Sequence, residues 1–133
     1  MRVLVVEDDF ISRRLLCRYL QAFAECDVAV NGNEAVGAFK QVLQAGQRYD
    51  LVCLDIMMPG MDGQETLKRL RALEREHKVA DETRTKVIMT TALEDHDNLM
   101  AAFNNACDGY VVKPIEKRKF LETLQEIGLP VAV

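Results

Sequence analysis

The chain has 133 residues, of which 49% are hydrophobic and 29% are charged, so it can form one domain with its own core. Its net charge of −4 and pI near 5.2 argue against a general nucleic-acid binder, whose surface is basic, and against an anionic membrane surface as partner. No apolar run approaches the ~20 residues needed to span a bilayer.

Short apolar runs alternate along the chain with longer amphipathic segments. The apolar runs predict strands at residues 3–6, 28–30, 51–54, 87–90 and 110–112. Apolar residues at helical spacing predict helices over residues 11–23, 35–43, 67–73, 99–106 and 120–127. A polar stretch at 75–86 predicts an exposed connection, and 129–133 form a tail too short for another domain.

This strict alternation predicts one α/β domain over residues 1–133. Five strand–helix units form a doubly wound, five-stranded parallel sheet with five helices on its two faces. In such sheets, ligands bind beyond the carboxyl ends of the strands. The residues that follow each strand are therefore the candidates for function.

Acidic residues follow two of the predicted strands. Glu7 and Asp8 come after the first strand, and Asp55 ends the third, whereas Asp9 is expected to cap the first helix. If these two strands are neighbours, their ~4.8 Å spacing brings the three carboxylates together, where they repel one another. A hard divalent cation such as Mg²⁺ would relieve the repulsion.

Two further polar groups stand at strand ends. Thr91 supplies a hydroxyl after the fourth strand, and Lys113 supplies a mobile ammonium after the fifth. Carboxylates, metal, hydroxyl and ammonium together suit phosphoryl transfer, which depends on positioning and charge neutralisation. An aspartate can itself act as the nucleophile and form an acyl phosphate.

Four motifs, "VLVVEDD", "LVCLDIMMPGMDG", "VIMTTA" and "GYVVKP", occur in the order and at the spacing of a known family. On these motifs the chain resembles the receiver domain of a two-component response regulator, and in particular a stand-alone, chemotaxis-regulator-like receiver. The resemblance covers residues 2–128. It implies a flavodoxin-like fold with strand order 2-1-3-4-5.

The resemblance also implies how the acidic site would work. Asp55 would accept the phosphoryl group. Asp8 would bind Mg²⁺ directly and Glu7 through water, and the backbone carbonyl of Met57 would be the third protein ligand.

Residues of the fourth and fifth strands would complete the switch. The resemblance assigns the switch hydroxyl to Thr91, with Thr90 facing away from the site. It assigns the phosphate-pairing ammonium to Lys113, whose bond to Pro114 would be cis. Tyr110 matches the aromatic residue that reorients on activation.

Met57 and Leu93 are apolar at two positions where some family members have polar groups that hold the attacking water. We therefore expect slow loss of the phosphoryl group and a long-lived signal.

The implied function is a phosphoacceptor signalling switch. A histidine kinase or histidine phosphotransfer protein would donate the phosphoryl group, and the surface of the fourth helix, fifth strand and fifth helix would respond by binding an unknown downstream protein. Direct binding to nucleic acid or membrane is not expected. The chain would be a monomer or a weak phosphorylation-dependent dimer, and it would catalyse its own phosphorylation and dephosphorylation without being a metabolic enzyme.

Two other functions fit the sequence less well. A Mg²⁺-dependent phosphohydrolase with an aspartate nucleophile would need a second aspartate at position 57, which is Met, and a cap domain. Flavin binding would need a phosphate loop rich in Ser, Thr and Gly after the first strand, and the acids of residues 7–9 would repel that phosphate.

Four scattered cysteines form no C-x-x-C pair and are interpreted as reduced, mostly buried thiols: Cys17, Cys26, Cys53 and Cys107. Met1 leads directly into a strand-like run, which predicts no signal peptide, a cytoplasmic location and a plausible stand-alone start. Whether the chain is part of a larger protein is left open by the sequence.

Overall fold

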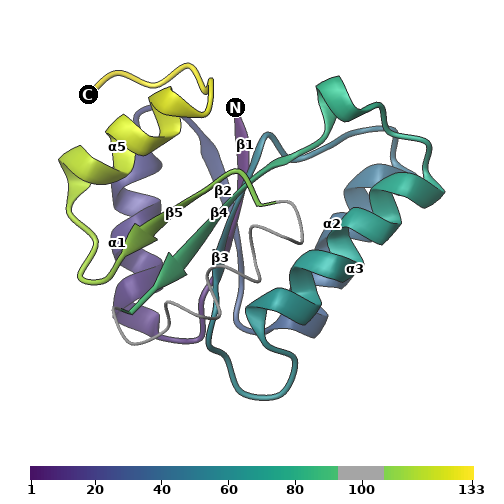
Figure 1. Cartoon of the computed structure of the whole chain (residues 1–133), viewed down its shortest axis with the longest axis horizontal. Coiled ribbons are helices and arrows are strands. Elements are labelled where there is room, and N and C mark those ends of the chain that lie inside the picture. The colour runs from purple at the N-terminus through teal and green to yellow at the C-terminus, as the bar shows by residue number, and fades with distance from the viewer. Residues whose placement is uncertain (93–106) are drawn as a thin grey trace.

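The computed structural model describes residues 1–92 and 107–133 of the chain. The five strands are β1 (Arg2–Val6), β2 (Glu25–Ala29), β3 (Leu51–Asp55), β4 (Lys86–Thr91) and β5 (Gly109–Val112). They form one parallel sheet in the order β2-β1-β3-β4-β5 (Figure 1). The predicted fold class and strand order are therefore confirmed.

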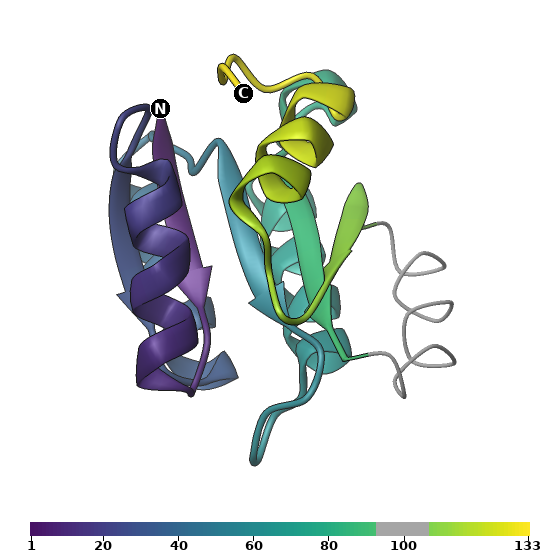
Figure 2. The same ribbon diagram turned by 90° about the vertical axis from the view of Figure 1, so that its left-hand side faces the viewer.

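Helices cover both faces of the sheet (Figures 1 and 2). Helices α1 (Phe10–Leu20) and α5 (Lys117–Glu126) lie on one face, and α2 (Gly32–Gln44) and α3 (Gly63–Glu76) lie on the other. Successive strand residues point to opposite faces, so Val3 and Val5 pack toward α1 and α5 while Leu4 packs toward α2 and α3. The predicted helix at 99–106 lies outside the described residues.

The second strand begins earlier than the sequence predicted. It runs from Glu25 to Ala29 rather than over 28–30, and three of its five residues are exposed. The reason is that β2 is an edge strand that pairs only with β1. An edge strand with one neighbour tolerates polar residues, so its start is not marked by an apolar run.

The first three helices begin with side-chain caps. Asp9 accepts a hydrogen bond of 2.8 Å from the Ser12 N–H, and hydrogen bonds from the Ser12 side chain and N–H lower the pKa of the Asp9 carboxyl. Asn31 and Asp62 cap α2 and α3 in the same way. The expected cap at Asp9 is confirmed, so the Asp9 carboxylate is occupied at the start of α1. None of the described helices has the length and apolar character needed to cross a membrane.

A buried charge network joins α3 to the starts of β4 and β5. Arg71 contacts Glu74 at 2.8 Å and Asp108 at 3.2 Å. Glu74 accepts from the Thr85 N–H, and Asp108 accepts from the Val87 N–H. The exposed connection predicted at 75–86 is shorter in the structure, because α3 extends to Glu76 and β4 begins at Lys86, and it is exposed only in part. It contains one 3₁₀ turn, η1 (Asp81–Thr83), and turns inward at Thr85, which is 1% exposed.

Gly63, the first residue of α3, packs directly on the end of β3. Its N–H donates to the Ile56 carbonyl at 2.8 Å. A Cβ at this position would lie 2.7 Å from the Ile56 Cα and would also overlap the Asp55 carbonyl oxygen. The absence of a side chain lets α3 approach the backbone that holds Asp55.

We predict that Gly63→Ala lowers the free energy of unfolding by ~1–3 kcal/mol, because the added methyl group must displace backbone. Gly37→Ala is the matched control. Gly37 lies inside α2 with open space around it, so alanine there should stabilise the fold by ~0.5–1 kcal/mol. Urea unfolding of both variants measures the difference. Equal stability of the Gly63→Ala variant and the wild type would show that α3 does not require this approach.

Candidate functional site

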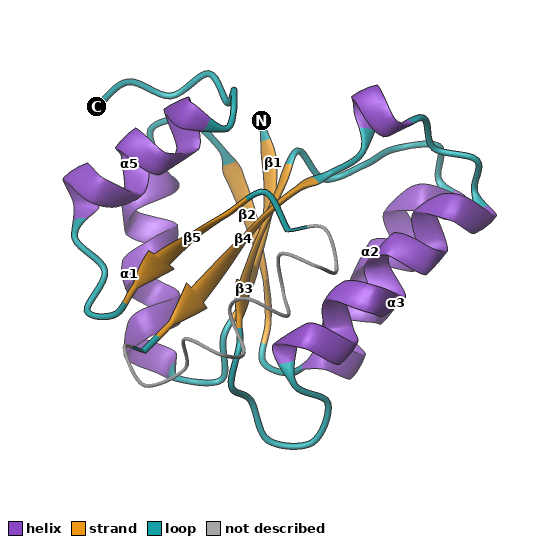
Figure 3. Ribbon diagram, in the orientation of Figure 1, coloured by secondary structure: helices purple, strands orange, loops and turns teal. Residues whose placement is uncertain are grey.

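The acidic residues predicted to meet do meet at the carboxyl edge of the sheet. Strands β1 and β3 are paired with Val6 opposite Leu54, so the next residues, Glu7 and Asp55, are neighbours. The loops after β1, β3 and β5 open at the same edge (Figure 3). Carboxylate oxygens of Glu7, Asp8 and Asp55 lie within 4.8 Å of one another.

Burial differs sharply among the three acids. Glu7 is 1% exposed and Asp55 is 5% exposed, whereas Asp8 faces solvent. Burial, together with the hydrogen bond to Asp55 and the negative charge of that residue, raises the pKa of Glu7 from 4.5 to about 8. Without a bound metal, Glu7 therefore keeps its proton to a higher pH than an exposed glutamate does. The sequence did not indicate this, because it depends on how the strands pack.

Lys113 bridges the two buried acids. Its ammonium donates to Glu7 Oε1 at 3.1 Å and lies 3.2 Å from Asp55 Oδ2. Burial on its own would lower the pKa of Lys113, but the charges of Asp55 and Glu7 outweigh that effect and raise it. The Lys113–Pro114 peptide bond is cis, as the resemblance implied.

Arg13 is a further contact that the sequence did not indicate. Its guanidinium, on the first turn of α1, donates to the Glu7 carbonyl oxygen at 2.8 Å. Arg13 therefore fixes the backbone of Glu7 from outside the sheet. No sequence pattern distinguishes it from the other arginines of α1.

The two threonines that end β4 have different surroundings. Thr91 is 3% exposed, and its hydroxyl donates to the Ala92 carbonyl at 3.0 Å. Its own carbonyl accepts from the Lys113 N–H at 2.7 Å, which joins the ends of β4 and β5. The Thr90 hydroxyl is buried and has no hydrogen-bond partner among the described residues.

The adjacent methionines after β3 have separate surroundings. Met57 is 54% exposed beside the acidic cluster, and its N–H donates to Asp55 Oδ1 at 3.3 Å. Met58 is 7% exposed and packs into the core beneath α2 and α3. Gly60 follows with φ of 78°, a turn conformation that glycine favours. Leu93, the other predicted rate-tuning position, lies outside the described residues.

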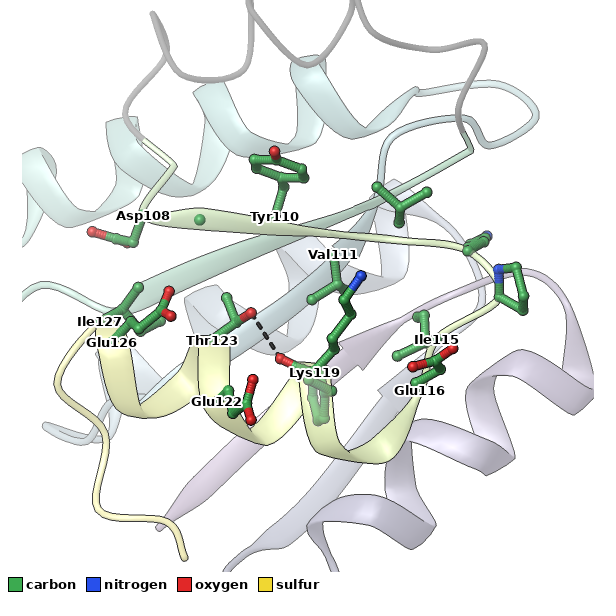
Figure 4. Close-up of a pocket in the computed structure, with 15 residues that line it drawn as sticks. Asp108, Tyr110, Val111, Ile115, Glu116, Lys119, Glu122, Thr123, Glu126 and Ile127 are labelled. Carbon is green, nitrogen blue, oxygen red and sulfur yellow. Dashed lines mark hydrogen bonds between the residues drawn. The ribbon is translucent and has the colours of Figure 1, made fainter. Parts of the chain in front are cut away.

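A groove of about 670 Å³ runs along β5 and α5, and its lining includes Lys113, which also contacts the acidic cluster (Figure 4). Tyr110, 44% exposed, and Val111 point to opposite sides of β5. Lys119 and Thr123 on α5 and Ile127 just after it line the groove, and the Thr123 hydroxyl donates to the Lys119 carbonyl at 2.8 Å. Tyr110 therefore lies on the surface of β5, beside β4, the strand that ends in Thr91.

The acidic cluster fits a magnesium ion. Carboxylate oxygens are the hard ligands that Mg²⁺ prefers, and the ion commonly uses one or two of them together with waters. Asp8 is exposed and gives the cluster access to solvent. The repulsion between Glu7 and Asp55 favours the binding of a positive charge. With Lys113 beside it, the site can bind and neutralise a phosphoryl group.

The family model for the response regulator receiver domain matches residues 3–125. The chain belongs to the response regulator receiver family. This confirms the resemblance that the four motifs indicated.

Curated relatives of this receiver domain include longer proteins. It is 36% identical to the regulatory protein VanRB of Enterococcus faecalis over 132 residues, covering 96% of this chain and 52% of the relative. It is 37% identical to the transcriptional regulatory protein ResD of Bacillus subtilis, covering 89% of this chain and 44% of the relative. The receiver domain thus spans about half the length of these relatives.

Solved structures show the same fold. The chemotaxis protein CheY4 of Vibrio cholerae superposes with a TM-score of 0.77 at 28% identity, covering 95% of this receiver domain and 97% of that chain. A co-crystal structure of the Saccharomyces cerevisiae histidine phosphotransfer signaling protein Ypd1 with the receiver domain of Ssk1 gives a TM-score of 0.81 at 25% identity, covering 96% and 88%.

We predict that the metal-free receiver loses stability as the pH rises through the Glu7 pKa. The folded state holds a proton on Glu7 more tightly than the unfolded state does, so the contribution is complete below pH 4.5 and is lost as the pH passes about 8. Glu7→Gln removes this titration. The difference in free energy of unfolding between wild type and variant should change by up to ~1.4 kcal/mol per pH unit.

Urea unfolding at a series of pH values, with a chelator present, measures this difference. Glu82→Gln, on the exposed η1 turn, is the control and should follow the wild type at every pH. Parallel curves for wild type and Glu7→Gln would mean that Glu7 is ionised throughout the range.

Proposed function

We propose that this receiver domain is a phosphoacceptor switch in which Asp55 receives a phosphoryl group from a phosphohistidine. The donor is a histidine kinase or a histidine phosphotransfer protein. The observation that carries the proposal is the position of Asp55, at the end of a wholly buried strand and 3.2 Å from the Lys113 ammonium. Membership of the receiver family supports the same reading.

The chemistry follows from the groups around Asp55. A carboxylate oxygen of Asp55 attacks phosphorus, the new O–P bond forms, and the N–P bond to the donor imidazole breaks. Glu7, Asp8 and Asp55 would hold Mg²⁺ with the Met57 carbonyl, and the ion would supply positive charge to the phosphoryl oxygens. Lys113 supplies a second positive charge.

The switch consists of two polar groups changing partners. In the unmodified protein, Lys113 pairs with Glu7 and the Thr91 hydroxyl bonds to Ala92. Phosphoryl oxygens on Asp55 offer both groups a more negative partner. Because the Thr91 carbonyl also holds the Lys113 N–H, the ends of β4 and β5 move together.

The output is a change in protein binding on the surface that includes β5, Tyr110 and α5, together with the helix predicted at 99–106. The partner is a downstream protein rather than nucleic acid or membrane, and the domain is a monomer or a weak phosphorylation-dependent dimer. It catalyses its own phosphorylation and dephosphorylation. We infer a cytoplasmic location, which the four free thiols support because oxidising compartments favour disulfides.

Incubation with acetyl phosphate and Mg²⁺, followed by acid quenching and mass spectrometry, tests the acceptor. The wild type should gain one phosphoryl group that is labile to base, and Asp55→Asn should gain none. Asp81→Asn, an exposed acid on η1, is the matched control and should be modified like the wild type. Continuous release of phosphate from phosphoesters without a trapped adduct would instead support the phosphohydrolase.

The lifetime of the acyl phosphate tests the rate-tuning positions. Met57→Asn combined with Leu93→Glu introduces polar groups at the two positions where the family resemblance predicts that such groups hold the attacking water. Decay should become roughly tenfold faster, the effect of one well-placed hydrogen bond worth ~1.4 kcal/mol in the transition state. Met58→Leu is the control because Met58 is buried away from the site. Unchanged decay in the double variant would contradict a role for these positions.

A further inference from the structure

Two of the four cysteines come together where α1 packs on the edge strand. Cys17 lies on α1 and Cys26 on β2, and these two elements pack against each other. Helix α1 lies over β1 and β2 (Figure 2). Both cysteines pack against the cluster around Val3 and Leu20. No sequence pattern indicated this pairing.

Accessibility separates this pair from the other thiols. Cys17 and Cys26 are partly exposed, whereas Cys53 and Cys107 are buried. Cys53 is in the middle of β3 and 1% exposed, so an oxidant cannot reach it without unfolding the sheet. Only the turn at 21–24 separates α1 from β2, so the two sulfurs belong to adjoining segments. The prediction of mostly buried thiols therefore holds for two of the four.

The two thiols differ in acidity in the way that a reactive pair requires. Interaction with the neighbouring Cys26 thiol lowers the pKa of Cys17 to about 7; burial opposes this effect, and the positive charge of Arg13 assists it. The same interaction, together with burial, raises the pKa of Cys26. Cys17 is thus the better nucleophile near neutral pH, and Cys26 keeps its proton until it has a partner to attack.

We propose that Cys17 and Cys26 form a reversible dithiol–disulfide site that reacts with low-molecular-weight disulfides such as glutathione disulfide. Cys17 is the attacking thiol and Cys26 is the resolving thiol. This site is separate from the phosphoacceptor function and does not depend on it. Its geometry rests on the contact between α1 and β2, and reversible disulfides of this kind are the ones found in reducing compartments.

The reaction proceeds in two exchanges. The Cys17 thiolate attacks one sulfur of glutathione disulfide, so a Cys17–glutathione disulfide forms and one glutathione thiolate leaves. The Cys26 thiol then loses its proton and attacks the Cys17 sulfur, which releases a second glutathione. The protein loses two electrons and two protons, and one glutathione disulfide becomes two glutathione molecules.

Equilibration of the whole chain with buffers of reduced and oxidised glutathione tests this site. Acid quenching and peptide mass spectrometry then locate each modification. The wild type should lose two hydrogens across the peptides that contain Cys17 and Cys26, and dithiothreitol should restore them. Asp55→Asn should form the same disulfide, which separates this test from that of the phosphoacceptor.

Two single variants assign the roles. Cys26→Ser should accumulate a glutathione adduct on Cys17, because no second thiol resolves it. Cys17→Ser should take up glutathione roughly tenfold more slowly, because the low-pKa thiol is gone. Cys107→Ser is the control and should behave like the wild type, and circular dichroism verifies that each variant is folded.

Three results would overturn the proposal. A lasting glutathione adduct on Cys17 of the wild type would show that Cys26 cannot reach it. Faster modification of Cys53 or Cys107 would show that exposure and acidity do not select the pair. An absence of modification in folded wild-type protein would show that the site is unreactive.

Discussion

The repulsion between carboxylates at the ends of β1 and β3 is the constraint on which the rest of the structure depends. Parallel pairing brings Glu7 and Asp55 together in a nearly dry place, and two adjacent negative charges are unstable there. Without a bound metal, Glu7 keeps a proton to higher pH, and the ammonium of Lys113 contacts both acids. The proton and the ammonium can both be displaced, so the site is stable without a metal and can still accept a cation and a phosphoryl group.

The fold holds these opposing charges in place from several sides. Arg13 fixes the Glu7 backbone from α1, and Gly63 allows α3 to pack against the backbone of Asp55. At the amino ends of the strands, the Arg71 network joins α3 to β4 and β5. These two strands lead to Thr91 and Lys113 at their carboxyl ends. Contacts at the carboxyl and the amino ends of the strands therefore hold the elements around the charged site in place.

The sequence predicted what strand order and spacing determine, and it missed what tertiary packing determines. β1, β3 and β4 are buried on both faces, so their apolar runs marked them to within a residue or two. β2 was misplaced because an edge strand lacks that signal. The meeting of Glu7, Asp8 and Asp55 was predictable from topology, whereas the proton on Glu7 and the contact of Cys17 with Cys26 depend on burial and side-chain direction.

All five residues of β3 are buried, so the strand that carries Asp55 is enclosed on both faces. β5 is shorter, lies at the edge of the sheet and is partly exposed. The contact of Asp55 with Lys113, and the bond from the Lys113 N–H to the Thr91 carbonyl, connect the enclosed strand to this edge strand. The sheet is therefore graded, from an enclosed centre that carries Asp55 to an exposed margin.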